Sequence, residues 1–223
     1  NKAKKFLSGC ATLKKNGDSY TATISLSLSG SEARSPLDDK DYAALRSALH
    51  VGELNILSKP GLFGWDKVDK GSRLLIEQLT EVLGGLDHKP SSLLDLGCGF
   101  GYLTLASHDI ELDYRCATDN NAAALIAAKA NFQQSSLKVD TLAADCADSI
   151  DRTFDLILCN PPFHQGFSVT GDLTNKFLAA IRRLLSHSGT ALLVVNQFVP
   201  IERKASALNF SVTLLVNNGS FKV

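Results

Sequence analysis

The sequence predicts an α/β fold in which helices cover both faces of a mostly parallel sheet. Three observations lead to this prediction. Continuously apolar runs such as SLLDL, FDLILC and TALLVV alternate with segments of helical periodicity, which is typical of parallel strands buried between helices. A glycine-rich turn follows the first of these runs. The chain ends in two β-type runs around Asn218-Gly219, which predict an antiparallel hairpin at the sheet edge.

The elements of this sheet follow one another along the chain. Residues 71–86 carry leucine and valine at helical spacing and end in Gly-Gly, so we predict a helix there. The segment SLLDLGCG then predicts a buried strand that runs into glycines. Beyond it we predict strands at 114–119, 139–145, 154–160 and 190–198, and helices at 121–132 and 175–189, the last of them ended by Gly189.

The N-terminal segment has a different pattern. Asn16-Gly17 lies between two runs of β-type residues, which is a hairpin signal. Residues 31–40 are polar and rich in turn formers, so we predict a linker there, followed by a short helix within residues 41–50. We therefore divide the chain into a small β-hairpin appendage, residues 1–45, and a main domain, residues 46–223.

The composition is that of an ordinary globular protein without a strong overall field. Hydrophobic residues make up 44% and charged residues 21% of the chain. The 23 basic and 23 acidic side chains cancel, so a polyanion must be held by a local patch. No apolar stretch approaches the roughly 18 residues of a membrane span, and no signal peptide opens the chain. We expect a cytoplasmic protein with no membrane association.

The sulfur-containing residues add two expectations. Five cysteines lack the close pairs that mark zinc or redox sites, so we expect a reducing compartment, no bound metal, and thiols that act mainly as small buried hydrophobes. The chain contains no methionine, even at position 1. From this we expect a fragment of a longer protein, or a sequence that lacks methionines of the natural chain.

The first chemical signal is the turn DLGCGFG, residues 95–101, which leaves a strand and enters a helix. Open parallel sheets bind ligands at this position, and glycines let a ligand approach the main chain closely. A dinucleotide fingerprint reads G-x-G-x-x-G, whereas Gly97, Gly99 and Gly101 form G-x-G-x-G. Asp95 would repel a pyrophosphate but could accept a hydrogen bond from a cationic amino-acid ligand. The turn therefore favours S-adenosylmethionine over a nicotinamide dinucleotide.

Acidic residues end the next two predicted strands. Asp119 can accept hydrogen bonds from both hydroxyls of a ribose, and the Asp145-Cys146 pair can receive the amino group of adenine. A strand-terminal Asp can instead cap the following helix, and for Asp119 alone the two interpretations are equal. Acids at the ends of three successive strands favour cofactor binding.

The second chemical signal is Asn160-Pro161-Pro162-Phe163. Two prolines can simply end a strand, but this corner lies at the same sheet edge as the glycine turn. The lone pair of an exocyclic base amine is delocalised into the ring, so methylation requires acceptors for both N–H groups. The Asn160 side-chain carbonyl and the Pro161 main-chain carbonyl can serve, and Phe163 can stack on the base. For His164 we expect a structural or substrate-contact role.

With both motifs in place, the sequence resembles the class I S-adenosylmethionine-dependent methyltransferases over residues 51–223. The segments VGELNILSKPGLFGWDKVDKGSRLL, LDLGCGFGYL and CNPPFHQGF more closely resemble the ribosomal RNA guanine-N2 methyltransferases, whose small-subunit 16S and large-subunit 23S enzymes are siblings. The resemblance implies a Rossmann-like sheet, S-adenosylmethionine as cofactor, and ribosomal RNA, within a ribosomal subunit, as partner of a monomeric enzyme.

The resemblance also implies roles for individual residues. The cofactor would be bound by Asp95, Gly97, Gly99, Gly101, Asp119, Asp145 and Cys146, and closed over by Asp69, Gly71 and Ser72. The guanine amine would be held by Asn160, Pro161, Pro162 and Phe163. Phe63, Gly64 and His164 would lie near the substrate, although a local aromatic anchor in a turn is an equal alternative for Phe63 and Gly64. Family members usually carry an N-terminal half that helps to hold RNA, so residues 1–45 would be the tail of such a half or a small remnant.

Several alternatives to 16S guanine-N2 methylation stay open. The same corner would suit 23S ribosomal RNA, a protein glutamine or a DNA adenine, although Phe163 in place of Tyr favours guanine. A non-catalytic RNA-binding module is a further hypothesis, against which the intact glycine turn and Asn-Pro-Pro-Phe argue. Basic residues including Lys59, Lys67, Lys70 and Arg73 gather in one part of the chain, and RNA binding should weaken with salt if they converge beside the pocket.

Overall fold

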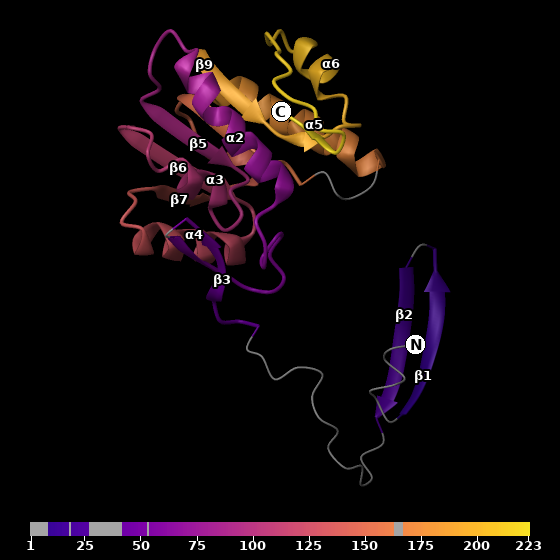
Figure 1. The fold of residues 1–223 in the computed structure, drawn as a ribbon. Coiled ribbons are helices and arrows are strands. Elements are labelled where there is room, and N and C mark those ends of the chain that lie inside the picture. The colour runs from indigo at the N-terminus through magenta and orange to yellow at the C-terminus, as the bar shows by residue number, and fades with distance from the viewer. Residues whose placement is uncertain (1–8, 18, 27–41, 53, 163–166) are drawn as a thin grey trace. The chain divides into compact units, whose positions relative to one another are not determined.

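The computed structural model describes residues 9–17, 19–26, 42–52, 54–162 and 167–223 and divides the chain into two compact units, Asn1–Asp41 and Tyr42–Val223 (Figure 1). The predicted linker at 31–40 lies outside the described residues. The smaller unit contains an antiparallel pair, β1 (Gly9–Asn16) and β2 (Ser19–Leu26). Gly17 has a φ of +59° in the turn between them, so the predicted hairpin is confirmed.

The larger unit is built on a five-stranded parallel sheet with the order β7-β6-β5-β8-β9. Its strands are β5 (Ser92–Leu96), β6 (Tyr114–Asp119), β7 (Asp140–Ala143), β8 (Phe154–Cys159) and β9 (Leu185–Leu193). The chain moves outward from β5 to β7, then returns to place β8 on the other side of β5. Ligands bind at such a switch point, outside the carboxyl ends of the strands.

Helices cover both faces of this sheet, as predicted (Figure 1). On one face, Leu75 of α2 (Lys70–Gly84) packs in one cluster with Leu93 and Leu156. On the other face, Ile181 of α5 (Phe167–Leu184) packs with Leu94 and Ile157. Because successive side chains of a strand point to opposite faces, the two faces of β5 and β8 are both buried, which explains their continuous apolar character.

The remaining helices complete these layers. The short helix α3 (Tyr102–Ala106) and α4 (Ala122–Gln134) contribute Leu105 and Phe132 to a third buried cluster. A 3₁₀ turn, η1 (Asp145–Ala147), packs beside α5 through Ala147. In the part of the chain that the structure describes, no helix is both long and apolar enough to cross a membrane.

The predicted short helix within residues 41–50 is wrong. The chain instead forms an antiparallel pair, β3 (Arg46–Val51) and β4 (Leu54–Ser58), in which Leu49 lies opposite Ile56. Both side chains are buried in the cluster that contains Phe132 of α4. The alanines at positions 43, 44 and 48 favour a helix locally, but the tertiary packing of an apolar strand pair against α4 decides the conformation of residues 46–51.

Gly189 also has a different role from the predicted one. Helix α5 ends at Leu184, and Gly189 lies within β9. A Cβ atom at this position would meet the main-chain oxygen of Phe154 at 2.9 Å. The glycine therefore permits a close approach of β9 to β8 rather than a helix end.

The C-terminal hairpin is confirmed, but it does not join the edge of the five-stranded sheet, because its returning strand belongs to a separate two-stranded sheet. The main-chain N–H of Asn218 donates to the oxygen of Phe221, and that of Val223 donates to Val216. The returning strand β11 (Phe221–Lys222) pairs antiparallel with β10 (Val195–Asn196), and α6 (Ile201–Ser206) lies between these strands in the sequence.

One buried amide joins the β3–β4 pair to the main domain. The Asn131 side chain is only 2% exposed. Its Oδ1 accepts from the N–H of Leu57 at 2.7 Å, and its Nδ2 donates to the carbonyls of Leu57 and Phe100, each at 2.9 Å. A single side chain of α4 thus satisfies main-chain groups of β4 and of the glycine turn.

We expect Asn131→Ala to lower the free energy of unfolding by roughly 2–4 kcal/mol, because it leaves buried main-chain groups unpaired. Urea denaturation of the whole chain would measure this. Gln134→Ala is the matched control, since Gln134 also donates from α4 to β4, at Asn55, but does so at the surface. An equal loss in both variants would contradict the role given to Asn131.

Candidate active site

A cavity of about 500 Å³ lies at the carboxyl ends of β5, β6 and β8, a size typical of sites for small organic ligands. Eleven of the predicted site residues line it: Phe63, Gly64, Asp69, Ser72, Gly97, Gly99, Asp119, Asp145, Cys146, Asn160 and Pro162. Four further predicted site residues are buried and do not line the cavity: Asp95, Gly71, Gly101 and Pro161. Phe163 and His164 lie outside the described residues.

The glycine turn requires its glycines for two different reasons. All three have positive φ angles, of 78°, 55° and 90° for Gly97, Gly99 and Gly101, a region that L-residues other than glycine rarely adopt. A Cβ at Gly99 would meet nothing within 4 Å, whereas a Cβ at Gly101 would meet the Phe132 ring at 2.7 Å. Gly99 therefore keeps the cavity open, and Gly101 lets the turn pack on α4.

Asp119 is held by main-chain groups through both of its carboxylate oxygens. Oδ2 accepts from the N–H of Gly99 at 2.9 Å, and Oδ1 accepts from the N–H of Asn121 at 2.8 Å. Asn121, not Asp119, is the N-cap of α4, since its side chain accepts from Ala123. Capping therefore does not explain the presence of Asp119. Each oxygen keeps a second lone pair that can accept from a ligand.

Asp95 lies fully buried beneath the turn. Its Oδ2 accepts from the main-chain N–H and the hydroxyl of Thr104, at 3.1 and 2.7 Å. Among the described residues its Oδ1 has no hydrogen-bond partner. Burial raises the pKa of Asp95 to about 7, although the hydrogen bonds from Thr104 act in the opposite direction. A positive charge in the cavity would favour the ionised form of this carboxyl.

The Asn160 carboxamide has a defined orientation. Its Nδ2 donates to Asp69 Oδ2 at 2.9 Å and to Ser72 Oγ at 2.8 Å. Because an ionised carboxylate can only accept, the amide nitrogen must be the atom that faces Asp69. Within the described residues no group donates to Asn160 Oδ1. The side chain therefore keeps its carbonyl oxygen available for a ligand.

Asp69 and Ser72 connect this amide to the start of α2. Asp69 is the N-cap of the helix, and its Oδ2 also accepts from the N–H of Ser72 at 2.8 Å. Gly71 is packed so closely that a Cβ there would meet Asp69 Oδ2 at 3.0 Å. Asp69 and Ser72 therefore contact Asn160 directly, a contact that the sequence did not indicate.

The third strand-end acid has a less enclosed setting. Asp145 is half-exposed and forms an ion pair with Lys176 of α5, whose pKa this contact raises. Cys146, which follows it, has a φ of 51°. Burial raises the pKa of the Cys146 thiol to about 11 and those of Cys98 and Cys159 well above their usual range. These thiols are therefore neutral near pH 7, as expected for hydrophobic cysteines.

Several cavity residues were absent from the sequence prediction. Leu62, Tyr102, Asn120, Asn121, Leu173 and Phe177 line the cavity. Asn120 and Asn121 could have been found, because they directly follow Asp119. Phe177 belongs to α5, and only the packing of that helix brings its ring within 3.5 Å of the Cβ position of Gly97.

A family model described as "Methyltransferase small domain" matches residues 53–223. The chain belongs to the methyltransferase small domain family. This membership confirms the resemblance to class I methyltransferases, with the Rossmann-like sheet that it implied.

The matches to curated relatives include a larger share of this methyltransferase small domain than of the relatives themselves. The "Ribosomal RNA small subunit methyltransferase C" of Erwinia tasmaniensis is 33% identical over 78% of this chain and 49% of its own length. The protein of the same name from Shewanella amazonensis is 28% identical over 92% of this chain and 57% of its own. The chain thus spans about half the length of these curated relatives.

A solved structure of similar fold is the T. Thermophilus 16S rRNA N2 G1207 methyltransferase (RsmC) in complex with AdoMet and guanosine. It is 27% identical to this methyltransferase small domain, with a TM-score of 0.74, and the match covers 99% of this chain and 58% of that one.

The last two glycines of the turn should respond differently to substitution. We expect Gly101→Ala to lower the free energy of unfolding by about 2–4 kcal/mol, because it combines overpacking against Phe132 with a strained φ. Gly99→Ala carries the strain alone, so about 1–2 kcal/mol is expected. Urea denaturation of both variants tests this, and a larger loss for Gly99→Ala would contradict it.

The buried Asp95 should make stability depend on pH. Its pKa is higher in the folded chain than its usual value near 3.9, so the folded state binds more protons between about pH 4 and pH 7. The contribution of this group to the free energy of unfolding therefore falls as pH rises through that range, by an amount on the order of a few kcal/mol.

Urea denaturation of wild type and Asp95→Asn across this range isolates the contribution, because the variant cannot titrate at that position. We expect the variant to lose less stability than the wild type as pH rises. A difference between the two proteins that does not change with pH would rule out this assignment.

Proposed function

We propose that this protein transfers a methyl group from S-adenosylmethionine to N2 of a guanine in ribosomal RNA, in the 16S RNA of the small subunit. The observation that carries the proposal is the orientation of Asn160, whose amide nitrogen is bound by Asp69 and Ser72 while its oxygen stays available beside the glycine turn. The names of the relatives and the AdoMet and guanosine bound to the T. Thermophilus enzyme support the same reaction.

The cavity residues fit this cofactor. S-adenosylmethionine supplies an electrophilic methyl group on a positively charged sulfur. The free lone pairs of the Asp119 carboxylate suit the hydroxyls of its ribose, and the open face of Gly99 admits the ligand to the main chain. The negative charge of Asp95 beneath the turn favours a cationic ligand over a pyrophosphate. We assign Asp145 and Cys146 to the adenine end, where Asp145 would share its oxygens with Lys176.

The Asn160-Pro161 corner would position the guanine amine. Asn160 Oδ1 and the Pro161 carbonyl accept one N–H each, which holds the nitrogen lone pair toward the methyl donor. Pro161 and Pro162 carry no N–H groups that could compete, and Phe163 would stack on the base. Catalysis then depends mainly on positioning. The amine that has become cationic releases a proton to water, so His164 serves as a substrate contact rather than a general base.

The wider setting of the enzyme follows from the same assignment. We propose that it acts in the cytoplasm, as a monomer, on RNA within a ribosomal subunit. The match to the T. Thermophilus enzyme includes nearly the whole chain and only 58% of that protein. We propose that residues 1–45 form an appendage to the methyltransferase domain of residues 46–223.

The alternative targets can be separated in one assay. Labelled S-adenosylmethionine would be incubated with the protein and either small subunits, large subunits, free ribosomal RNA, DNA or total protein. We expect label in 16S RNA, at a guanine. Label only in 23S RNA, in DNA or in protein would overturn the proposed substrate, and no label in any of them would favour a non-catalytic module.

We expect Asn160→Ala to lower the rate of methyl transfer by at least about a hundredfold, because it removes an acceptor that positions the amine. Cofactor affinity, measured by calorimetry, should be nearly unchanged. Ser72→Ala is a graded comparison, because Asp69 still orients the amide in this variant, and we expect a smaller loss. Wild-type activity of Asn160→Ala would refute the mechanism.

A further inference from the structure

We propose that Phe63, Trp65, Arg46 and Tyr42 form a stacking surface that binds unpaired RNA nucleotides next to the target guanine. This inference rests on the proposed function, because it assigns the part of the RNA substrate that lies outside the cavity. We call these four residues the stacking surface.

The stacking surface begins at the mouth of the cavity. Phe63 and Gly64 line the cavity, and the Phe63 side chain is nevertheless 56% exposed. The loop that carries them is fixed by successive turns, in which the N–H of Trp65 donates to Leu62 and that of Lys67 donates to Gly64, each at 3.2 Å. Leu62 is buried in the cluster that contains Phe100 of the glycine turn. The loop is therefore anchored to the floor of the site.

Arg46 connects the loop to the start of the larger unit. Its guanidinium carbon lies 5.8 Å from the centre of the Trp65 ring and 5.9 Å from that of the Tyr42 ring. Trp65 is half-buried against the core, whereas Tyr42 is 50% exposed. The Arg46 guanidinium thus lies near both the Trp65 and the Tyr42 rings. Bases stack on aromatic faces and on guanidinium planes alike.

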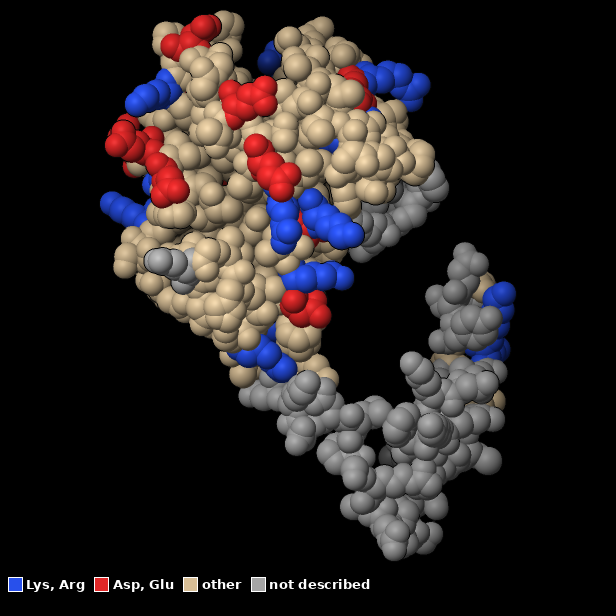
Figure 2. All heavy atoms as spheres, viewed as in Figure 1, with Lys and Arg blue, Asp and Glu red and all other residues tan. Residues whose placement is uncertain are grey.

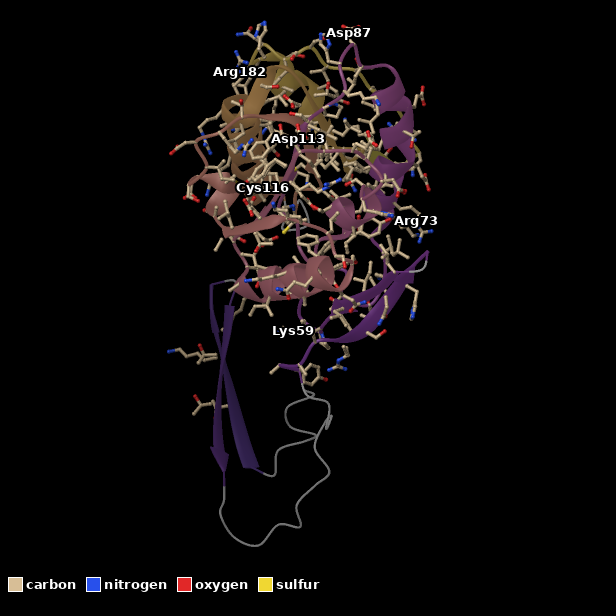
Figure 3. All side chains as sticks on the ribbon, turned by 90° about the vertical axis from the view of Figure 1, so that its left-hand side faces the viewer. Lys59, Arg73, Asp87, Asp113, Cys116 and Arg182 are labelled. Atoms are coloured by element: carbon tan, nitrogen blue, oxygen red, sulfur yellow. The ribbon has the colours of Figure 1, made fainter. Side chains whose placement is uncertain are left out.

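The charges around this surface suit a phosphate backbone. Lys67, Lys70 and Arg73 are exposed, and Lys59 is half-exposed, with its Nζ near the carbonyl of Ala43 at 3.4 Å. Figure 2 shows Lys and Arg side chains in a row from the start of α2 to the start of β3, with an acidic side chain among them. Figure 3 places Lys59 and Arg73 well away from Asp87, which lies beyond the other end of α2.

This combination favours unpaired RNA over other partners. A duplex presents only phosphates and groove edges, since its bases are stacked on one another, and would use the lysines without the rings. An unpaired strand can place bases on the rings while its phosphates contact the basic row. The target guanine must itself leave any stack to enter the cavity, so its neighbours are the nucleotides that this surface would meet.

Binding of fluorescent oligoribonucleotides to the 223-residue chain tests the inference. The probes are a short unpaired strand with one central guanine and the same strand in a duplex. We expect Tyr42→Ala and Trp65→Leu each to weaken binding of the unpaired strand by about 5- to 100-fold and to change duplex binding little. Trp65→Leu keeps an apolar side chain against the core, and thermal melting would verify that both variants fold.

Salt dependence gives a second readout. For the unpaired strand, Arg46→Gln and Lys67→Gln should each reduce the slope of log affinity against log salt by about 0.7. The matched controls are Lys89→Gln and Lys138→Gln, because these exposed lysines precede β5 and β7 and therefore lie at the amino ends of the strands. The controls should leave affinity and slope unchanged.

Failure of the inference and failure of the proposed function are distinguishable. Wild-type methylation of RNA together with unchanged binding by Tyr42→Ala and Trp65→Leu would overturn the stacking surface alone. If Tyr42→Ala and Trp65→Leu lose activity on intact subunits but keep their affinity for free RNA, the surface would contact a ribosomal protein instead. That result would also overturn the inference. If the wild type binds the unpaired strand through these residues but transfers no methyl group to RNA, the proposed function fails and the surface stands.

Discussion

The Asp69 carboxylate joins the beginning of α2 to the end of β8, and the geometry of the cavity depends on this connection. One oxygen accepts both from the N–H of Ser72, as a helix cap, and from the amide of Asn160. The cap fixes the first helical turn of α2, which presents the Ser72 hydroxyl to the same amide. Helix start and strand end therefore cannot shift independently. An active site that works by positioning requires such rigidity, because small displacements of the amine acceptors would reduce the rate.

The glycine turn shows a conflict between stability and ligand binding. Asp95 is buried with one oxygen that has no hydrogen-bond partner among the described residues, an arrangement that disfavours the charged form in the absence of a ligand. The three glycines of the turn, which all have positive φ, add conformational entropy to the unfolded chain. Both features make sense for a site that receives a cation at close range. Destabilised groups of this kind are common where binding or catalysis requires them.

The proposed RNA surface includes a region that lies before the five-stranded sheet in the sequence. The β3–β4 pair is held to α4 and to the glycine turn through Asn131, so the residues that precede and follow it are placed relative to the cavity. Arg46 at the start of β3 and Trp65 in the next loop are thereby brought together. The same buried amide thus contributes to the fold and to the proposed RNA surface.

The sequence by itself determined the parallel sheet, the two chemical corners and eleven of the residues that line the cavity. Continuous apolar strands, and the glycines or prolines that follow them, are local signals. They appear where the chain must be buried or must turn sharply. Only the tertiary structure decided the strand pair at 46–58, because its packing on α4 outweighs a local helical preference. The structure alone also revealed the Asp69 and Ser72 contacts with Asn160, the stack of Arg46 on Trp65, and Phe177 in the cavity wall. Each of these joins residues that are far apart in the chain, and such contacts leave no periodic or adjacent pattern in a single sequence.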